Sequence, residues 1–217
     1  MLNPHAILID FDDTLAYSSR SRRPLLEAEL RLWGGSASDV ESIRSRWGQP
    51  FRELVSSTIR PELYERFLDS YKQRMRRNPP IACPGAFEFL HELHSRGVPV
   101  IVVTSSLSDL VREDLVALEM QQFVGAIFGA DETSFHKPDP RVFVEIGLEM
   151  ARRGYGELED FLFIGDSLSD YTSSIGVCSF WAVLTGETSE EAFVAAGLAQ
   201  REVFASLKEI LPLLSSP

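Results

Sequence analysis

The chain has 217 residues, of which 44% are hydrophobic and 24% charged, the ordinary balance of a chain that can bury a core. No apolar run approaches the roughly 20 residues of a membrane-spanning helix, and the first residues lack the basic leader of a signal peptide, so we expect a cytoplasmic protein without a membrane partner. The formal net charge of −11 argues against general nucleic-acid binding.

The first predicted element is a short apolar run at residues 5–10 that ends at a carboxylate, which suits a buried parallel strand. Helical periodicity follows and predicts four helices, at residues 24–33, 38–47, 50–59 and 61–77. Proline in the first turn favours three of these starts. Ser36 or Ser38 is the expected N-cap of the second helix, with Glu41 placed for a capping box.

After residue 82 the chain alternates between strands and helices. The predicted strands are residues 98–104, 124–128, 161–165 and 179–184, and the predicted helices are 84–96, 107–120, 140–153 and 169–175. This alternation predicts an α/β fold with a doubly wound parallel sheet and helices on both faces. Because the first strand precedes the helical block, residues 15–82 are expected to be an inserted helical domain, and residues 1–14 and 83–217 the core domain.

The charge of the chain is divided unevenly between these two parts. Residues 15–82 carry 13 Lys and Arg against 8 Asp and Glu, a net charge of +5, and the remainder carries 8 against 24, a net charge of −16. A basic segment inserted in an acidic body is expected to face something anionic, in the body's own site or in solution. The alternative is that these charges lie on solvated helix faces.

Polar side chains follow the predicted strands at their carboxyl ends, where open parallel sheets bind ligands. These residues are Asp10, Asp12, Asp13, Thr104, Ser105, Lys137, Asp166 and Asp170. Carboxylates gathered at one edge repel each other unless a cation offsets their charge. A site of oxygen ligands favours Mg²⁺, which also binds substrate phosphate.

In these residues the chain resembles the haloacid dehalogenase-like (HAD) superfamily of aspartyl-nucleophile phosphatases. Four motifs occur in order: Asp-x-Asp-x-Thr after an apolar strand at residues 7–15, a strand ending in Thr at 102–104, Lys-Pro-x-Pro at 137–140 and Gly-Asp-Ser-x-x-Asp at 165–170. One Asp-x-Asp would be a weak signal, but four ordered motifs at strand ends are specific. The resemblance covers essentially the whole chain and implies a Rossmann-like core with an inserted helical cap, as in phosphoglycolate phosphatase-like members.

The resemblance implies a Mg²⁺-dependent phosphatase that hydrolyses a small-molecule phosphate monoester. Asp10 would attack phosphorus to form an aspartyl-phosphate, and Asp12 would act first as general acid and then as general base. Mg²⁺ would be held by the Asp10 carboxylate, the Asp12 backbone carbonyl and Asp166. Asp170 would be a fourth ligand or a support behind the ligands, and the alternative is a plain helix residue.

The phosphoryl oxygens would be held by Thr104, Ser105 and Lys137, which offset the charge of the transition state. Thr104 could instead be a helix N-cap, and Lys137 a surface lysine. The sequence departs from the commonest family pattern at Asp13, where glycine is frequent, and at Ser105, where many relatives carry asparagine.

The inserted helices would form a cap that excludes water and supplies leaving-group specificity. Residues 46–53 resemble the glycine-containing loop that such caps point at the substrate. Trp33 and Trp47 are interpreted as cap core, and the alternative is that they are platforms for the substrate. The candidate specificity contacts are Arg46, Gln49 and Arg52, with Arg20, Arg22 and Arg23 near the hinge as further candidates, and ordinary cap surface is the alternative for all of the arginines.

Four other functions share parts of this pattern. A dehalogenase would not need Asp12 or Asp166, and a phosphonatase would want a Schiff-base lysine, for which the cap offers only Lys72. A hexose-phosphate mutase would need the same Asp10 and Asp12, so it stays open, and a non-catalytic scaffold would be expected to lose one of the motif residues. The expected partner is a small phosphorylated metabolite such as a glycolate-like or sugar phosphate, and the sequence makes no prediction of oligomeric state.

Overall fold

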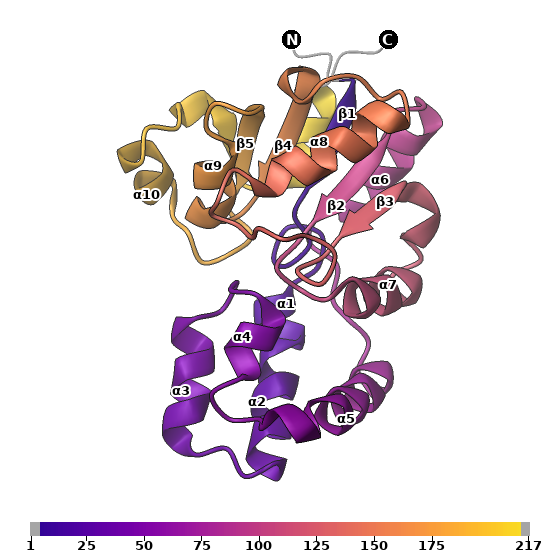
Figure 1. Cartoon of the computed structure of the whole chain (residues 1–217). Coiled ribbons are helices and arrows are strands. Elements are labelled where there is room, and N and C mark those ends of the chain that lie inside the picture. The colour runs from indigo at the N-terminus through magenta and orange to yellow at the C-terminus, as the bar shows by residue number, and fades with distance from the viewer. Residues whose placement is uncertain (1–4, 214–217) are drawn as a thin grey trace.

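A parallel sheet forms the centre of the larger lobe of the computed structural model, which describes residues 5–213 (Figure 1). Its strands lie in the order β3-β2-β1-β4-β5-β6 and pair in parallel throughout. They are β1 (Ala6–Ile9), β2 (Val100–Val103), β3 (Ala126–Phe128), β4 (Phe161–Gly165), β5 (Ser179–Val183) and β6 (Val203–Phe204). The strand order reverses at β1, as in doubly wound sheets. The predicted α/β fold class is confirmed.

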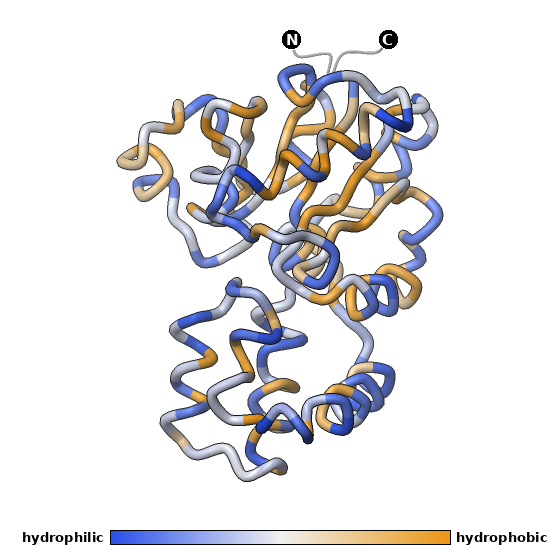
Figure 2. Tube along the Cα trace, viewed as in Figure 1, coloured by the Kyte–Doolittle hydropathy of each residue, from blue (hydrophilic) through white to orange (hydrophobic). Residues whose placement is uncertain are grey.

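The central strand β1 is buried on both faces, because successive side chains point to opposite sides of the sheet. Ile7 and Ile9 pack with α6 (Ala86–Ser95), α7 (Ser108–Ala117) and α11 (Leu207–Ile210), whereas Ala6 and Leu8 pack with α8 (Val142–Arg152) and α10 (Glu190–Ala195). This double burial explains why β1 is apolar throughout, and Figure 2 shows the strands as the most continuously hydrophobic segments. Within residues 5–213 no helix combines the length and the apolarity that crossing a membrane requires.

Five helices form a second lobe beneath the sheet in Figure 1, here called the helical lobe. They are α1 (Ser18–Ser21), α2 (Arg23–Leu32), α3 (Ala37–Ser45), α4 (Phe51–Val55) and α5 (Tyr64–Arg77). Their apolar faces share one hydrophobic cluster, which also takes in Leu107 and Leu110 at the start of α7. The helical lobe is therefore packed onto the sheet lobe through α7.

The boundaries of some elements differ from those predicted. The third predicted helix ends at Val55, and Pro61 starts a short 3₁₀ turn ahead of α5 rather than α5 itself. The N-cap of α3 is Ser36, which confirms one of the two predicted residues, but its capping box is formed with Asp39, so the predicted role of Glu41 was wrong. Elements that were not predicted are α1, α10, β6, α11 and the 3₁₀ turns Pro61–Leu63, Gln121–Phe123, Leu158–Asp160, Gln200–Glu202 and Leu211–Leu213.

The chain enters and leaves the helical lobe through two adjacent segments. Tyr17 N donates to Ile81 O at 2.8 Å, and Cys83 N donates to Leu15 O at 2.9 Å. These backbone bonds fix the two connections side by side beneath the carboxyl end of β1. A rotation of the helical lobe about this pair would change its distance from the strand ends.

Ion pairs join the two lobes, and in each of them the helical lobe supplies the cation. Among the described residues there are four: Arg22–Asp114, Arg23–Glu187, Lys72–Asp109 and Arg76–Glu113. The first is buried and bidentate, while the other three are partly open to solvent. The basic insertion thus faces, in part, the acidic body of the same chain.

Candidate active site

The polar residues of the site lie together because three strands end at the same level. Ile9 of β1 stands opposite Val102 of β2 and Ile164 of β4. Asp10, directly after β1, continues the pairing by donating its backbone N–H to Ile164 O at 2.9 Å. The residues that follow the neighbouring strands, Thr104 and Asp166, are placed at the same edge by this register.

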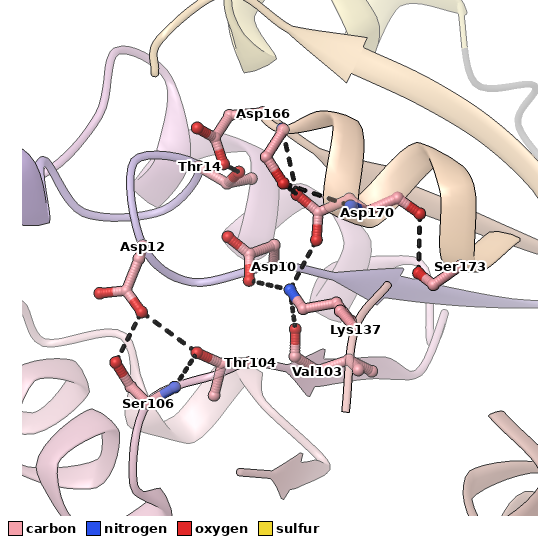
Figure 3. Close-up of polar contacts among 11 residues, drawn as sticks. Asp10, Asp12, Thr14, Val103, Thr104, Ser106, Lys137, Asp166, Asp170 and Ser173 are labelled. Atoms are coloured by element: carbon pink, nitrogen blue, oxygen red, sulfur yellow. Dashed lines mark hydrogen bonds and ion pairs between the residues drawn. The ribbon is translucent and has the colours of Figure 1, made fainter. Parts of the chain in front are cut away.

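Lys137 lies at the centre of the site and is buried, with 5% of its side chain exposed. Its Nζ donates to Asp10 Oδ1 at 2.6 Å, to Asp170 Oδ1 at 2.5 Å and to Val103 O at 3.1 Å (Figure 3). Burial alone would lower the pKa of Lys137, but the two carboxylates raise it above its ordinary value. The residue is a buried cation tied to Asp10 rather than a surface lysine.

Asp10, Asp166 and Asp170 each offer a carboxylate oxygen within 4.8 Å of the others. Burial raises the pKa of Asp10 well above its ordinary value, and the charges of Asp170 and Asp12 raise it further, against the opposing effect of Lys137. Burial and the charge of Asp10 raise the pKa of Asp166 as well. One lysine against three buried carboxylates leaves an excess of negative charge, and a divalent cation with oxygen ligands would offset it. These residues fit a Mg²⁺ site.

The two carboxylates after β4 differ in how many of their oxygens are engaged. Asp170 Oδ2 accepts from the backbone N of Ser167 at 3.1 Å and from its Oγ at 2.5 Å, in a capping box that starts α9 (Leu168–Ser174). Its other oxygen accepts from Lys137. Asp166 Oδ1 accepts from Thr14 Oγ1 at 3.4 Å. Asp170 therefore orients both a helix and the central lysine.

Two glycines allow the backbone to approach these carboxylates closely. A Cβ atom on Gly165 would lie 2.6 Å from Asp170 Cγ, and one on Gly186 would lie 1.7 Å from Asp166 Oδ2. Gly165 belongs to the fourth motif, but Gly186 was not predicted to matter. It lies in the loop after β5, where a lone glycine carries no signal until the fold is known.

Asp12 lies apart from the other three aspartates, on the opposite side of Asp10 from Asp166 and Asp170 (Figure 3). Its Oδ2 accepts from Ser106 Oγ at 2.7 Å and from Thr104 Oγ1 at 3.2 Å. The backbone N of Ser106 donates in turn to Thr104 Oγ1 at 3.0 Å. Thr104, which was predicted to bind phosphate, thus holds Asp12 in this arrangement. Ser106 holds Asp12 as well, and the sequence did not predict a role for it.

Asp13 occupies the position where glycine is frequent in the family that the motifs resemble. Its φ of 58° lies in the left-handed region, which aspartate tolerates better than most residues. Its Oδ1 accepts from the backbone N of Ser19 at 3.0 Å and from Ser19 Oγ at 2.8 Å. Burial raises the pKa of Asp13 to about 6, although these hydrogen bonds lower it. The extra carboxylate is thus tied to α1, beside the hinge.

The four motifs converge on one site, and comparison with known families agrees with their pattern. The family model of haloacid dehalogenase-like hydrolases matches residues 7–178. The chain belongs to this family. The match takes in all four motifs and the whole helical lobe.

Individual relatives share only a minority of their residues with this haloacid dehalogenase-like hydrolase. A phosphoglycolate phosphatase from Caulobacter vibrioides is 29% identical over 162 residues, which are 75% of this chain and 59% of that protein. This chain therefore spans less than two thirds of that relative's length. Two crystal structures share the fold. A predicted phosphoglycolate phosphatase from Haemophilus somnus has a TM-score of 0.78 and 17% sequence identity, and the match covers 98% of this chain and 99% of the other. A hydrolase from Pseudomonas syringae has a TM-score of 0.75 and 24% sequence identity, and the match covers 96% of each chain.

A cavity of about 550 Å³ lies between the motif residues and the helical lobe of this family member. Asp10, Asp12, Ser105 and Lys137 border it from the sheet, and Glu187 from the loop after β5. Trp47, Gly48 and Gln49 border it from the helical lobe. A larger cavity, about 660 Å³, lies beside β5 and β6 and has none of the motif aspartates in its wall, so the site is assigned from its chemistry and not its size.

The structure separates the predicted specificity residues of the helical lobe. Gln49 borders the cavity, whereas the described wall does not include Arg46 or Arg52. Arg46 Nε donates to Gln49 Oε1 at 2.8 Å, and the Arg52 guanidinium lies 4.1 Å from the ring centre of Tyr64. The hinge arginines also have partners within the protein, with Arg20 stacked on Tyr17 and Arg22 and Arg23 in the ion pairs between the lobes.

Trp47 packs in the helical lobe, as the sequence predicted, and it also borders the cavity. Its ring packs against the hydrophobic cluster of the helical lobe, as does that of Trp33. Trp47 also borders the cavity, where Trp33 is absent from the described wall. No periodicity distinguishes the two tryptophans, since the difference depends on which side of the lobe faces the sheet.

Proposed function

We propose that this protein is a Mg²⁺-dependent phosphatase that hydrolyses a small-molecule phosphate monoester through an aspartyl-phosphate. The observation that supports this most directly is the division between Asp10, held by Lys137 at 2.6 Å in the carboxylate cluster, and Asp12, held by hydroxyls outside it. Phosphoryl transfer on an aspartate needs two carboxylates with different surroundings, one as nucleophile and one as proton donor. Membership of the hydrolase family and the phosphatase relatives support the same chemistry.

In the first step Asp10 attacks phosphorus, and the bond between phosphorus and the leaving oxygen breaks. Asp12 gives its proton to that oxygen, so the leaving group departs as an alcohol. In the second step Asp12 takes a proton from water, which attacks phosphorus and releases inorganic phosphate from Asp10. Lys137 offsets negative charge on Asp10 and on the phosphoryl oxygens throughout.

The remaining residues hold these groups in place. Mg²⁺, bound by the carboxylates of Asp10 and Asp166 and the backbone carbonyl of Asp12, would supply charge neutralisation at the phosphoryl group. Asp170, whose oxygens are engaged by Lys137 and Ser167, acts as a support behind the metal ligands. Ser105 borders the cavity and binds a phosphoryl oxygen, while Thr104 orients Asp12.

The helical lobe acts in this proposal as a cap domain of residues 15–82 over a core of residues 1–14 and 83–217. It contributes one wall of the cavity and so contacts the leaving group rather than the phosphoryl group. A small phosphorylated metabolite fits a cavity of about 550 Å³, which is within the range of small-molecule sites.

Release of phosphate from p-nitrophenyl phosphate tests the proposal. With Mg²⁺ we expect turnover that EDTA stops and added Mg²⁺ restores, and Asp10→Asn should lower kcat by at least about a thousandfold because the nucleophile is lost. Asp69→Asn, an exposed change of the same kind in the helical lobe, should leave kcat unchanged. Turnover of no ester in a broad panel, or full activity of Asp10→Asn, would contradict the proposal. Hexose phosphates that give an isomer instead of free phosphate would identify a mutase.

A further inference from the structure

Trp47 carries a hydrogen-bond donor that the protein leaves without a partner. Its Nε1 is buried and makes no hydrogen bond to any residue from 5 to 213. The ring borders the main cavity and two smaller adjoining spaces, and Asp12 borders all three. A buried N–H without a partner is costly, and an acceptor on a ligand that reaches this edge of the ring would satisfy it. The position beside the proposed proton donor is that of the leaving group.

Gln49 adds a second neutral donor to the same wall. Its Oε1 accepts from Arg46 Nε at 2.8 Å, which fixes the amide and leaves its two N–H groups as donors. Gln49 borders both the main cavity and the smaller space that lies against Phe51. The helical lobe thus presents uncharged hydrogen-bond donors to the leaving group.

The described cations that line these spaces are each paired with a carboxylate of the protein, and Arg46, which contacts Gln49, donates to Gln49 Oε1 and to Glu53 O. Among the described lining residues the cations are Lys137, bound to Asp10 and Asp170, and Arg22, bound to Asp114. Arg23, whose guanidinium lies 5.8 Å from the ring centre of Trp47, is paired with Glu187. A carboxylate on the leaving group would therefore find no free cation in this wall.

Several carboxylates border the main cavity from the sheet lobe. They are Asp12, Asp13 and Glu187, of which Glu187 is paired with Arg23. An anionic leaving group would be brought out of water beside these carboxylates, and like charges placed together select against a ligand. A hydroxyl group, in contrast, accepts from an indole N–H and donates to a carboxylate at little cost.

We propose that Trp47 and Gln49 bind a neutral, hydroxyl-bearing leaving group, and that the site discriminates against phosphate esters with a carboxylate in that position. This inference rests on the proposed phosphatase function and names the class of its substrate. It separates the chain from the reaction that its phosphoglycolate phosphatase relatives are named for, because glycolate carries a carboxylate.

A matched pair of substrates tests the discrimination without any mutation. 2-Hydroxyethyl phosphate and 2-phosphoglycolate differ in the replacement of a CH₂OH group by a carboxylate, and phenyl phosphate has neither group. We expect kcat/KM for 2-hydroxyethyl phosphate to exceed that for 2-phosphoglycolate by at least about tenfold. An equal or reversed preference, with phenyl phosphate turned over, overturns this inference alone. Failure to hydrolyse any of the three esters or any ester of a broad panel overturns the proposed function with it.

Substitution of the two residues tests their roles. Trp47→Phe removes the N–H and should lower kcat/KM for 2-hydroxyethyl phosphate about three- to tenfold, with less than a twofold change for phenyl phosphate. Trp33→Phe, the matched change at a tryptophan whose Nε1 donates to Glu29, should alter neither value. An equal loss for both esters in Trp47→Phe would show a packing role and overturn the assignment.

A gain of function gives an independent measurement at an exposed position. Gln49→Lys places a free cation in the wall and should raise kcat/KM for 2-phosphoglycolate relative to 2-hydroxyethyl phosphate by about fivefold or more. If the ratio stays at the wild-type value, the lack of a free cation is not what sets the preference, and the inference fails.

Discussion

Asp12 is held by hydroxyl groups, whereas Asp10 is held by an ammonium group. Ser106 and Thr104 donate to the same oxygen of Asp12, and Lys137 donates to Asp10. A hydroxyl fixes the direction of a carboxylate without adding positive charge beside it, whereas Lys137 places a cation against Asp10. This difference suits Asp12 for proton transfer and Asp10 for nucleophilic attack.

Ser106→Ala tests whether this hydrogen bond positions the proton donor. We expect kcat/KM for an alkyl phosphate to fall about three- to tenfold, because an alkoxide needs protonation to leave and Asp12 would be less well oriented. For p-nitrophenyl phosphate the change should stay below about twofold, since nitrophenolate leaves without a proton. Ser106→Thr should restore the alkyl ester. A similar loss for both esters would assign Ser106 to general stability instead.

Among individual site residues, the sequence predicted those that follow strands and missed those that are placed by tertiary contacts. Asp10, Lys137 and Asp166 lie together because parallel strands end at one edge, which can be deduced from the order of the elements. Ser106 was one of several hydroxyls in a row, and its bond to Asp12 depends on the path of the loop after β2. The surroundings of Trp47 depend on how the helical lobe is docked, which no local pattern encodes.

Helix α7 connects the two lobes and belongs to both. Its residues Val111 and Leu115 pack beneath the sheet, while Leu107, just before the helix, and Leu110 pack into the cluster of the helical lobe. Asp109, Glu113 and Asp114 of the same helix pair with cations of the helical lobe. Helix α7 therefore supplies the acidic partner of three of the four described ion pairs between the lobes, together with apolar contacts to the helical lobe.

Leu110→Ala should measure how much the docking contributes to stability. Leu110 is buried, with 5% exposed, and its truncation should lower the free energy of unfolding by about 2–4 kcal/mol. Val116→Ala, on the exposed side of α7, should change it by less than about 0.5 kcal/mol. Urea denaturation monitored by tryptophan fluorescence provides both values. A Leu110→Ala variant as stable as the wild type would mean that the helical lobe is not coupled to α7.

Elements with a continuous apolar face or run were predicted, including the short strands β1 and β3, and several short elements without such a pattern were not. Helices α2, α5 and α8 and strand β4 lie within a few residues of their predicted bounds, because each has a continuous apolar face or run. β6 has two residues and α11 four, which is too short for any periodicity to be detected. Their structure is fixed by packing against β5 and α6 rather than by local sequence.

The opposite charges of the two parts become ion pairs between the lobes in the folded molecule. Three of the four pairs are partly exposed, and each such pair contributes about 1 kcal/mol or less. Arg22–Asp114 is buried and should respond little to salt. The opposite charges of the two parts thus favour docking of the lobes, but their ion pairs contribute too little free energy to determine the docking alone.

Salt should weaken this docking. The Debye length is about 10 Å at 0.1 M salt and about 3 Å at 1 M, so raising NaCl from about 0.05 M to about 1 M should screen the three exposed pairs. We expect a larger radius of gyration by small-angle X-ray scattering at high salt. The double variant Lys72→Ala, Arg76→Ala should show part of this expansion at low salt. A radius of gyration that is the same for the wild type and the double variant at both salt concentrations would argue against electrostatic docking.

The central position of β1 in the sheet has a consequence for the synthesis of the protein. Ile7 pairs with Val100 and Leu162, which follow it far along the chain. At about 5–20 residues per second, the ribosome needs on the order of 5–20 s to make the first of these partners. The helical lobe, whose contacts are mostly local in sequence, can collapse during this interval while the apolar strand still has no neighbour. The strand that ends at Asp10 is thus the one that the nascent chain leaves exposed for longest, and the one that a ribosome-associated chaperone would be expected to bind.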